Sequence, residues 1–310
     1  MRTLAFENLI LYLHVSSKTI LYFSGGTMQG IYGAGVVTAL EDANVYDRIE
    51  AVYSTSAGSL VAAYFLARQS RLGSAMMLED LVHDFISPSK FILGMYDRMW
   101  HYYIRNTPRE TWRNAIDIEY LFHAVRQTRR LDCDLLSNQS IPLYVKLINL
   151  QSRAIEYKDA RGPNVLQWLR AAVDVMPYTT DIQTIDGIAY ADAGIKQVIG
   201  LDTLTERHPD SHIMIILNSH RTRRLSHVVK NKLEGYFASI TGDEDFAANF
   251  ASAEYRLRSE LARIENMPHV RLYAIPDAIP IRASTTDLSI LQRTYEAGKA
   301  CGKKIASNLR

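Results

Sequence analysis

The sequence predicts an α/β fold, specifically a three-layer α/β/α sandwich with a mostly parallel central sheet. Short apolar runs that are typical of buried strands alternate with longer segments of helical spacing. Strands that are separated by helices pair in parallel, and helices then cover both faces of the sheet. The chain has 310 residues, 47% of them hydrophobic, which is ample for one sizeable core. We therefore expect a single domain over residues 1–310.

Two strand–loop–helix units are predicted near the start of the chain. Residues 4–15 are apolar and are compatible with either a strand or a short helix. The following runs predict strands at 19–23 and 49–53, and helices at 31–43 and 57–68. A helical insertion is expected over about 74–135, with segments at 76–85, 91–104 and 118–131 that Pro88 and Pro108 separate.

The second half of the chain alternates in the same way. Its predicted strands lie at 143–148, 154–157, 212–217 and 270–275, and its predicted helices at 164–175, 228–240, 246–265 and 288–309. Asp186-Gly187 stands between apolar residues, which predicts a tight hairpin turn that leads to Asp192. The candidate helix N-caps are Asn164 for the first of these helices and Thr285, Thr286 or Asp287 for the last.

Composition excludes several classes of protein. The formal net charge of +2 gives no reason to expect a nucleic-acid partner. Cys133 and Cys301 are the only cysteines, so a disulfide framework or a zinc site is excluded and a reducing compartment is favoured. No apolar run reaches the ~20 residues that a transmembrane helix needs. We expect a cytoplasmic protein that can bind at membrane surfaces.

Two loops at the ends of the first two predicted strands carry the chemically promising residues. They are Ser24-Gly25-Gly26-Thr27-Met28-Gln29-Gly30 and Ser54-Thr55-Ser56-Ala57-Gly58-Ser59. Where a strand turns into a helix, the turn lies beside free backbone N–H groups at the helix N-terminus. This arrangement favours a nucleophile at Ser56 next to an oxyanion hole in the first loop. The alternatives are that Ser56 is an ordinary helix cap and that the first loop is only a tight turn.

The glycine-rich loop does not fit a nucleotide site. Gly25 and Gly30 have the spacing of a P-loop, but Ile31 and Tyr32 stand where its lysine and hydroxyl residue would be. The pattern Gly-x-Gly-x-x-Gly is absent as well. Backbone N–H groups aimed at an oxyanion are the better explanation for this loop.

Three motifs follow one another in a specific order. They are Gly25-Gly26-Thr27-Met28-Gln29-Gly30, Ser54-Thr55-Ser56-Ala57-Gly58 and Asp192-Ala193-Gly194. Together they resemble the patatin-like phospholipase family in order and spacing over about residues 18–219. The resemblance implies a lipid acyl hydrolase of phospholipase or lysophospholipase type with a Ser–Asp dyad. In it Ser56 would be the nucleophile, Asp192 the general base, and Gly25, Gly26 and Thr27 the oxyanion hole.

A Ser–Asp dyad makes demands on the aspartate. A carboxyl group with an ordinary pKa of roughly 4 is a weak base at neutral pH. We therefore expect Asp192 to be partly desolvated, which raises its pKa, and to contact Ser56 directly. The sequence has no metal-binding cluster, so no cofactor and no metal are expected and the chemistry is predicted to be independent of calcium.

Three positions depart from the family pattern. Thr27 replaces the third glycine, Gln29 replaces an arginine, and Ala193 replaces the glycine after the aspartate. A β-branched residue resists positive φ, so Thr27 is expected to alter the shape of the oxyanion loop. The alternative function is therefore a non-catalytic lipid-binding or regulatory protein with a degenerate oxyanion loop. A third interpretation is a soluble esterase for small acyl esters.

Two further features suit a lipid surface. Residues 91–105 mix apolar, aromatic and basic side chains, a composition that fits either a membrane interface or a buried helix beside an acyl pocket. Two groups of arginines could attract anionic headgroups or be ordinary solvated charges. They are Arg126, Arg129 and Arg130, and Arg221, Arg223 and Arg224.

Overall fold

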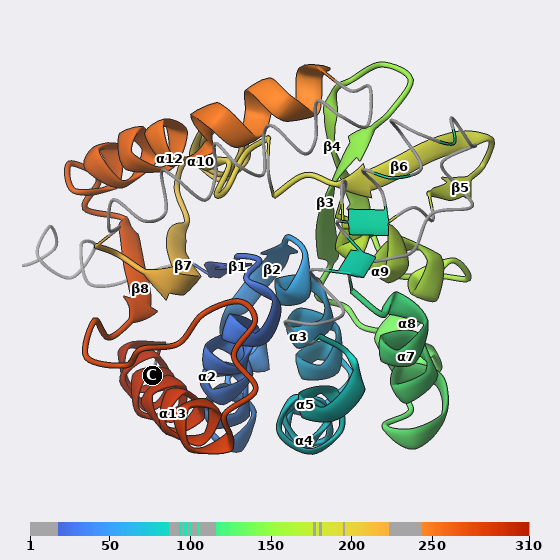
Figure 1. Ribbon diagram of the computed structural model, residues 1–310. Coiled ribbons are helices and arrows are strands. Elements are labelled where there is room, and N and C mark those ends of the chain that lie inside the picture. The colour runs from blue at the N-terminus through green and yellow to red at the C-terminus, as the bar shows by residue number, and fades with distance from the viewer. Residues whose placement is uncertain are drawn as a thin grey trace, which may run out of the picture.

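The fold is taken from a computed structural model of the chain (Figure 1). The structure describes residues 18–86, 93–94, 96–97, 100, 105, 116–175, 178–179, 182–194, 196–222 and 244–309. The predicted elements at 4–15 and 228–240, and most of the predicted helix at 91–104, lie outside these residues.

A mixed sheet forms the centre of the molecule. Within the described residues, eight strands lie in the order β5-β6-β3-β2-β1-β7-β8, with β4 also paired to β3. Their bounds are β1 Thr19–Phe23, β2 Ile49–Ser54, β3 Leu143–Asn149, β4 Ile155–Asp159, β5 Gln183–Ile185, β6 Ile188–Asp192, β7 His212–His220 and β8 Val270–Ile275. The pairs β3-β2, β2-β1, β1-β7 and β7-β8 are parallel, whereas β4, β5 and β6 make antiparallel pairs.

Helices cover both faces of the sheet. One layer contains α10 (Leu201–Arg207) and α12 (Glu244–Ile264), and the other contains α2 (Ile31–Asp42), α3 (Ala57–Leu66), α9 (Val165–Val173) and α13 (Leu288–Leu309) (Figure 1). The remaining helices are α4 (Ser70–Ala75), α5 (Leu81–Asp84), α7 (Ile118–His123) and α8 (Cys133–Ser137), with 3-10 turns η1 (Thr27–Gly30) and η2 (Tyr46–Arg48) and π turns η3 (Met76–Asp80) and η6 (Ala124–Thr128). The predicted α/β/α sandwich with a mostly parallel sheet is confirmed.

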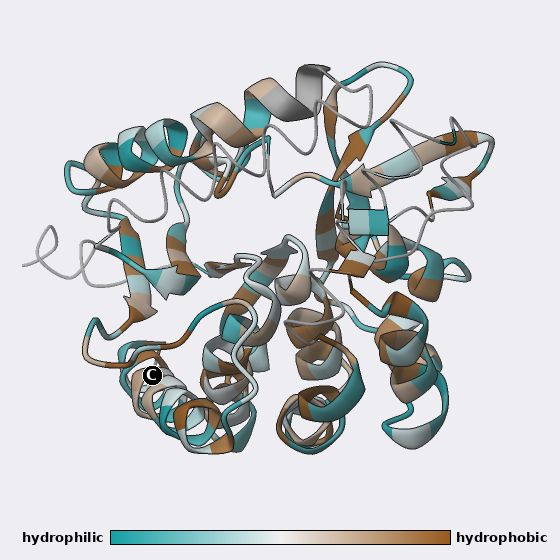
Figure 2. Cartoon of the chain, viewed as in Figure 1, coloured by the Kyte–Doolittle hydropathy of each residue, from teal (hydrophilic) through white to brown (hydrophobic). Residues whose placement is uncertain are grey.

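Each face of the sheet has its own hydrophobic core. Along β1, Leu21 and Phe23 belong to the core under α2 and α3, whereas Ile20 and Tyr22 belong to the core under α10 and α12. A strand buried on both faces must be apolar at every position, which is why the run at 19–23 does not alternate. Figure 2 shows hydrophobic colouring on α2, α3 and the strands between the layers, and mixed colouring on the outer helix α12.

Several local predictions are confirmed, with small differences. Asp186 and Gly187 both have positive φ, as a two-residue hairpin turn between β5 and β6 requires. Asp287 caps α13, because its Oδ1 accepts hydrogen bonds from the N–H groups of Ser289 (2.8 Å) and Ile290 (3.2 Å). Strand β7 continues to His220, three residues beyond its predicted end, and α10 was not predicted at all.

The pairing of β3 explains how the sheet brings distant segments together. Strand β4 pairs with Tyr144–Ile148 of β3, so it occupies one edge of that strand. Strands β2 and β6 must therefore share the other edge, where β2 pairs up to Val145 and β6 begins at Leu147. The carboxyl end of β2 consequently meets the carboxyl end of β6 across a short gap.

Candidate active site

Ser56 lies in a strained turn between β2 and α3. Its φ of 54° and ψ of −135° are unusual for a residue other than glycine, and such backbone strain costs on the order of 1–3 kcal/mol. Ser56 occupies the N-cap position of α3, but its side chain makes no capping hydrogen bond. The hydroxyl group is therefore available for another partner, as in a nucleophile elbow.

Asp192 is the acidic residue next to Ser56. It ends β6, opposite Leu147 of β3, and its side chain is only 2% exposed. The side chain of Ser56 lies next to its carboxylate and lowers its pKa, and its Oδ1 accepts a hydrogen bond from the N–H of Gly194 at 2.7 Å. The meeting of β2 and β6 on one edge of β3 produces this contact between residues that are 136 positions apart in the sequence.

The pKa of Asp192 is raised to about 6. Burial is the main cause, and it is opposed by the side chain of Ser56, by the hydrogen bond from the N–H of Gly194 and by the positive charge of Lys146. Asp192 is thus a desolvated carboxylate on the same side of the sheet edge as Ser56. A carboxylate with this pKa is largely ionised at pH 7 and is a stronger base than an exposed aspartate.

The glycine-rich loop lies against Ser56. A Cβ atom at Gly25 would be 2.6 Å from Cβ and 3.2 Å from Oγ of Ser56, so only glycine fits there. Gly26 and Thr27 have φ values of 150° and 51°. In the part of the chain that the structure describes, no group accepts a hydrogen bond from the N–H of Gly25, Gly26 or Thr27. Thr27 thus adopts positive φ although it is β-branched. Among the described residues its N–H, like those of the two glycines, has no hydrogen-bond acceptor.

Asn218 holds the glycine-rich loop from β7. Its Nδ2 donates to the carbonyl of Ser24 (2.6 Å), its Oδ1 accepts from the N–H of Gly33 (2.9 Å), and its N–H donates to Ser24 Oγ (2.8 Å). The loop and the first turns of α2 are thereby fixed to the neighbouring strand. No motif in the sequence marks Asn218, although a polar residue at the end of a buried apolar run is a usable signal.

An apolar cavity extends from Ser56 into the helical layer. Its volume is about 50 Å³. Its lining includes Thr27, Met28, Ser56 and Ala57, and also Tyr64, Ser70, Gly73 and Ser74 of α3 and α4. Met76 and Met77 also line the cavity, and long thioether side chains adapt readily to a changing space.

The predicted lipid-attracting features have mixed outcomes. Nine of the fifteen residues 91–105 lie outside the described residues. Arg129 is paired with Asp80 at 2.6 Å and Glu79 at 2.5 Å, and Arg221 is paired with Glu265. These two arginines are thus engaged by carboxylates of the chain itself. Among the helices that the structure describes, none is both long and apolar enough to cross a membrane.

Two solved structures are similar to the chain. The crystal structure of VipD from Legionella pneumophila is 13% identical, with 94% of this chain and 67% of that chain covered and a TM-score of 0.47. The second match is a chain in the structure of full-length SpcU in complex with full-length ExoU, from the type III secretion system of Pseudomonas aeruginosa. It is 14% identical, with 78% of this chain and 53% of that chain covered and a TM-score of 0.29. The chain thus spans about half the length of this second one. No curated protein sequence matches the chain.

A family model provides the assignment. The model described as "Patatin-like phospholipase" matches residues 21–205, which is more than half of the chain. The matched segment begins in β1 and contains Ser56, Asp192 and the glycine-rich loop. The chain belongs to the patatin-like phospholipase family.

Proposed function

We propose that the chain is a serine lipid acyl hydrolase of phospholipase or lysophospholipase type. The observation that carries the proposal is the buried carboxylate of Asp192, which lies next to the side chain of Ser56 in its strained turn. A serine becomes an effective nucleophile when a positioned base takes its proton and fixed donors stabilise the oxyanion. In this proposal Ser56 is the nucleophile and Asp192 is the general base.

The proposed reaction proceeds in two acyl-transfer steps. The proton of Ser56 moves to Asp192 while Oγ attacks the ester carbonyl, and the N–H groups of Gly25, Gly26 and Thr27 stabilise the oxyanion. Asp192 then gives the proton to the leaving alcohol oxygen, which leaves an acyl group on Ser56. Water attacks the acyl group with Asp192 again acting as base, and the fatty acid is released with Ser56 regenerated.

The apolar cavity beside Ser56 supports a lipid substrate. An acyl chain whose carbonyl carbon sits at Ser56 Oγ can extend between α3 and α4, where the lining is mainly apolar. The present volume of about 50 Å³ is too small for a fatty acyl chain. We propose that Met28, Met76 and Met77 change rotamer to admit it, because unbranched thioether side chains rearrange at low cost.

The competing function is a non-catalytic lipid-binding protein, and it rested on Thr27 and Gln29. Thr27 adopts a positive φ of 51° and leaves its N–H without a partner among the described residues. Both observations favour an oxyanion loop that can act as a donor. Gln29 still lacks the fixed positive charge of an arginine, so Gln29→Arg is expected to raise the rate.

The test is the release of fatty acid from vesicles of mixed phospholipid and lysophospholipid. We expect release by the natural chain, and a loss of at least about 10³-fold in Ser56→Ala and Asp192→Asn. Ser59→Ala is the matched control, because Ser59 lies one turn along α3 and its buried hydroxyl has no hydrogen-bond partner among the described residues. Folding of each variant is checked by circular dichroism.

Two outcomes would contradict the proposal. One is a well-folded natural chain that releases no fatty acid with or without Gln29→Arg, and the other is activity that survives Ser56→Ala. Short-chain esters assayed in parallel distinguish a lipid hydrolase from an esterase for small substrates. A chelator is included as well, and loss of activity in its presence would contradict the predicted independence of calcium.

A further inference from the structure

A lysine is completely buried beneath the candidate site. Lys146 lies on β3 with no exposed surface, and a buried ammonium group is costly unless its N–H groups are satisfied. Its Nζ donates to the hydroxyl of Tyr22 at 3.0 Å and to the carbonyls of Gln197 (2.5 Å), Val198 (3.3 Å) and Ile199 (3.2 Å). The family motifs do not include this residue, so the mechanism above does not use it.

The hydrogen bonds of Lys146 reach both segments that carry the proposed dyad. Tyr22 shares a hydrogen bond of 2.9 Å with Thr55, the residue immediately before Ser56. The carbonyls of 197–199 belong to the turn after Asp192, which is closed by the N–H groups of Lys196 and Gln197 on the carbonyl of Ala193. One ammonium group therefore connects the turn before Ser56 to the turn after Asp192.

The charged and titratable groups around Lys146 come from four neighbouring elements. They are Asp192 at the end of β6, Glu260 on α12, Tyr22 on β1 and Tyr157 on β4. Glu260 is itself engaged, because its carboxylate accepts hydrogen bonds from the N–H groups of Ile199, Gly200 and Leu201 at 3.2, 2.7 and 3.1 Å. The same turn is thus held by Lys146 through its carbonyls and by Glu260 through its N–H groups.

We propose that Lys146 is a positioning residue that fixes the segments of Ser56 and Asp192 relative to each other and presents a positive charge to Asp192. This inference rests on the proposed function for its catalytic consequence. Its structural basis, the hydrogen bonds of Nζ and the proximity of two opposite charges, does not depend on the substrate.

The pH range in which Lys146 influences Asp192 follows from the pKa values of these two groups. Burial lowers the pKa of Lys146 to about 7, against the raising influence of Glu260 and Asp192. Below pH 7 Lys146 is therefore mainly charged, and its charge lowers the pKa of Asp192, which is about 6. Removing the charge of Lys146 is expected to reduce the ionised fraction of Asp192 most strongly near pH 6. A protonated Asp192 cannot act as a base.

The first test measures Asp192 without any substrate. The ¹³C carboxyl resonance of Asp192 is identified by its loss in Asp192→Asn and titrated in the natural chain, Lys146→Met and Lys146→Arg. We expect the midpoint to rise by about one pH unit in Lys146→Met and to stay near the natural value in Lys146→Arg. Lys146→Gln is a second neutral variant in case the Met variant does not fold. An unchanged midpoint in a folded neutral variant would overturn the inference.

The second test measures the reactivity of Ser56 through its rate of labelling by a fluorophosphonate between pH 5 and 9. In Lys146→Met we expect the acid limb to move to higher pH by about one unit and the maximal rate to fall about tenfold. Tyr22→Phe removes the hydrogen bonds of this hydroxyl to Lys146, Thr55 and Val198 but keeps the charge of Lys146, so it should lower the maximal rate without moving the limb. The control is Lys158→Met on β4, where Lys158 pairs with Glu156 instead.

The two tests separate the inference from the proposed function. A natural chain that is neither labelled nor hydrolytic would contradict the proposed function, while the carboxyl titration would still decide whether Lys146 acts on Asp192. A labelled natural chain whose Lys146→Met variant has the same acid limb would contradict the inference alone.

Discussion

At the scale of single residues, the burial of Asp192 lowers stability at neutral and alkaline pH. Burial raises its pKa from 3.8 to about 6, so between these values the folded protein binds a proton that the unfolded chain has released. The contribution of Asp192 to stability is therefore greatest below pH 4 and is lost as the pH rises through 6. Above that range the site keeps a buried negative charge.

Replacing Asp192 by asparagine should therefore stabilise the folded chain at alkaline pH. Asparagine can still accept the hydrogen bond from Gly194 but carries no charge. We expect the free energy of unfolding at pH 8 to rise by about 2 kcal/mol, and the gain to shrink toward pH 4. Urea unfolding at the two pH values measures it, with the exposed Asp210→Asn as control. A gain of equal size at both values would show that ionisation of Asp192 is not the cause.

Thr27 was the residue whose conformation could not be predicted from its type. A β-branched side chain disfavours positive φ, yet Thr27 has φ of 51°. The tertiary structure overrides this preference, because the N–H of Met28 donates to the carbonyl of Ala283 at 3.2 Å and that of Gln29 to Gly26 at 3.0 Å. The two residues after Thr27 are thus held by one bond within the loop, to Gly26, and by one bond to a distant part of the chain, at Ala283.

At the scale of elements, β7 and α2 hold the glycine-rich loop through Asn218. Removing this side chain leaves the buried carbonyl of Ser24 and the N–H of Gly33 without their partner. We expect Asn218→Ala to lower the free energy of unfolding by about 2–3 kcal/mol and to slow fluorophosphonate labelling of Ser56. Denaturant unfolding and labelling are measured in parallel.

Asn138→Ala is the matched control for this prediction. Asn138 also donates from its amide, to the carbonyl of Asp134 at 2.9 Å, but at an exposed position. Asn138→Ala should lower the free energy of unfolding by less than about 1 kcal/mol. Equal destabilisation by the two variants would mean that the bonds of Asn218 do not hold the loop.

Elements and motifs differed in how well the sequence predicted them. Strands such as 19–23 and 270–275 were predicted at their observed bounds, because continuous apolar runs are local signals. Ser56 and Asp192 were identified as candidate site residues by their motifs. Lys146 and Asn218 were not, since their roles depend on which strands become neighbours, and that information is spread over more than a hundred residues.

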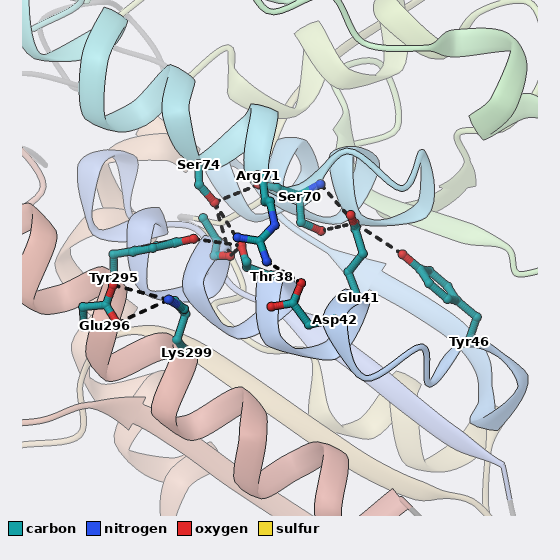
Figure 3. A network of polar contacts seen from close by, with 11 residues as sticks. Thr38, Glu41, Asp42, Tyr46, Ser70, Arg71, Ser74, Tyr295, Glu296 and Lys299 are labelled. Atoms are coloured by element: carbon teal, nitrogen blue, oxygen red, sulfur yellow. Dashed lines mark hydrogen bonds and ion pairs between the residues drawn. The ribbon is translucent and has the colours of Figure 1, made fainter.

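At the scale of the whole molecule, the elements beyond residue 205 support the site although the family model does not match them. Strand β7 supplies Asn218, α12 supplies Glu260, and α13 packs against α2, which begins where the glycine-rich loop ends. Figure 3 shows polar side chains of α2, α4 and α13 meeting at Thr38. Its Oγ1 lies 3.3 Å from the hydroxyl of Tyr295 and 3.2 Å from Oγ of Ser74.

The contact between α2 and α13 depends on glycines, and we predict that it will not accept a side chain. A Cβ at Gly298 would lie 2.1 Å from the carbonyl oxygen of Tyr32 and 3.2 Å from Cα of Gly35, both backbone atoms that cannot turn away. Gly298→Val should therefore push the helices apart and destabilise the chain by about 3 kcal/mol, which lowers the melting temperature by about 5 °C or more.

The control is Ala300→Val, which places the same side chain on the exposed face of α13 and should change the melting temperature little. If the two variants have the same melting temperature, the close approach of α2 and α13 does not contribute to stability. If only Gly298→Val unfolds at a lower temperature, and its Ser56 is also labelled slowly below that temperature, α13 maintains the glycine-rich loop through α2.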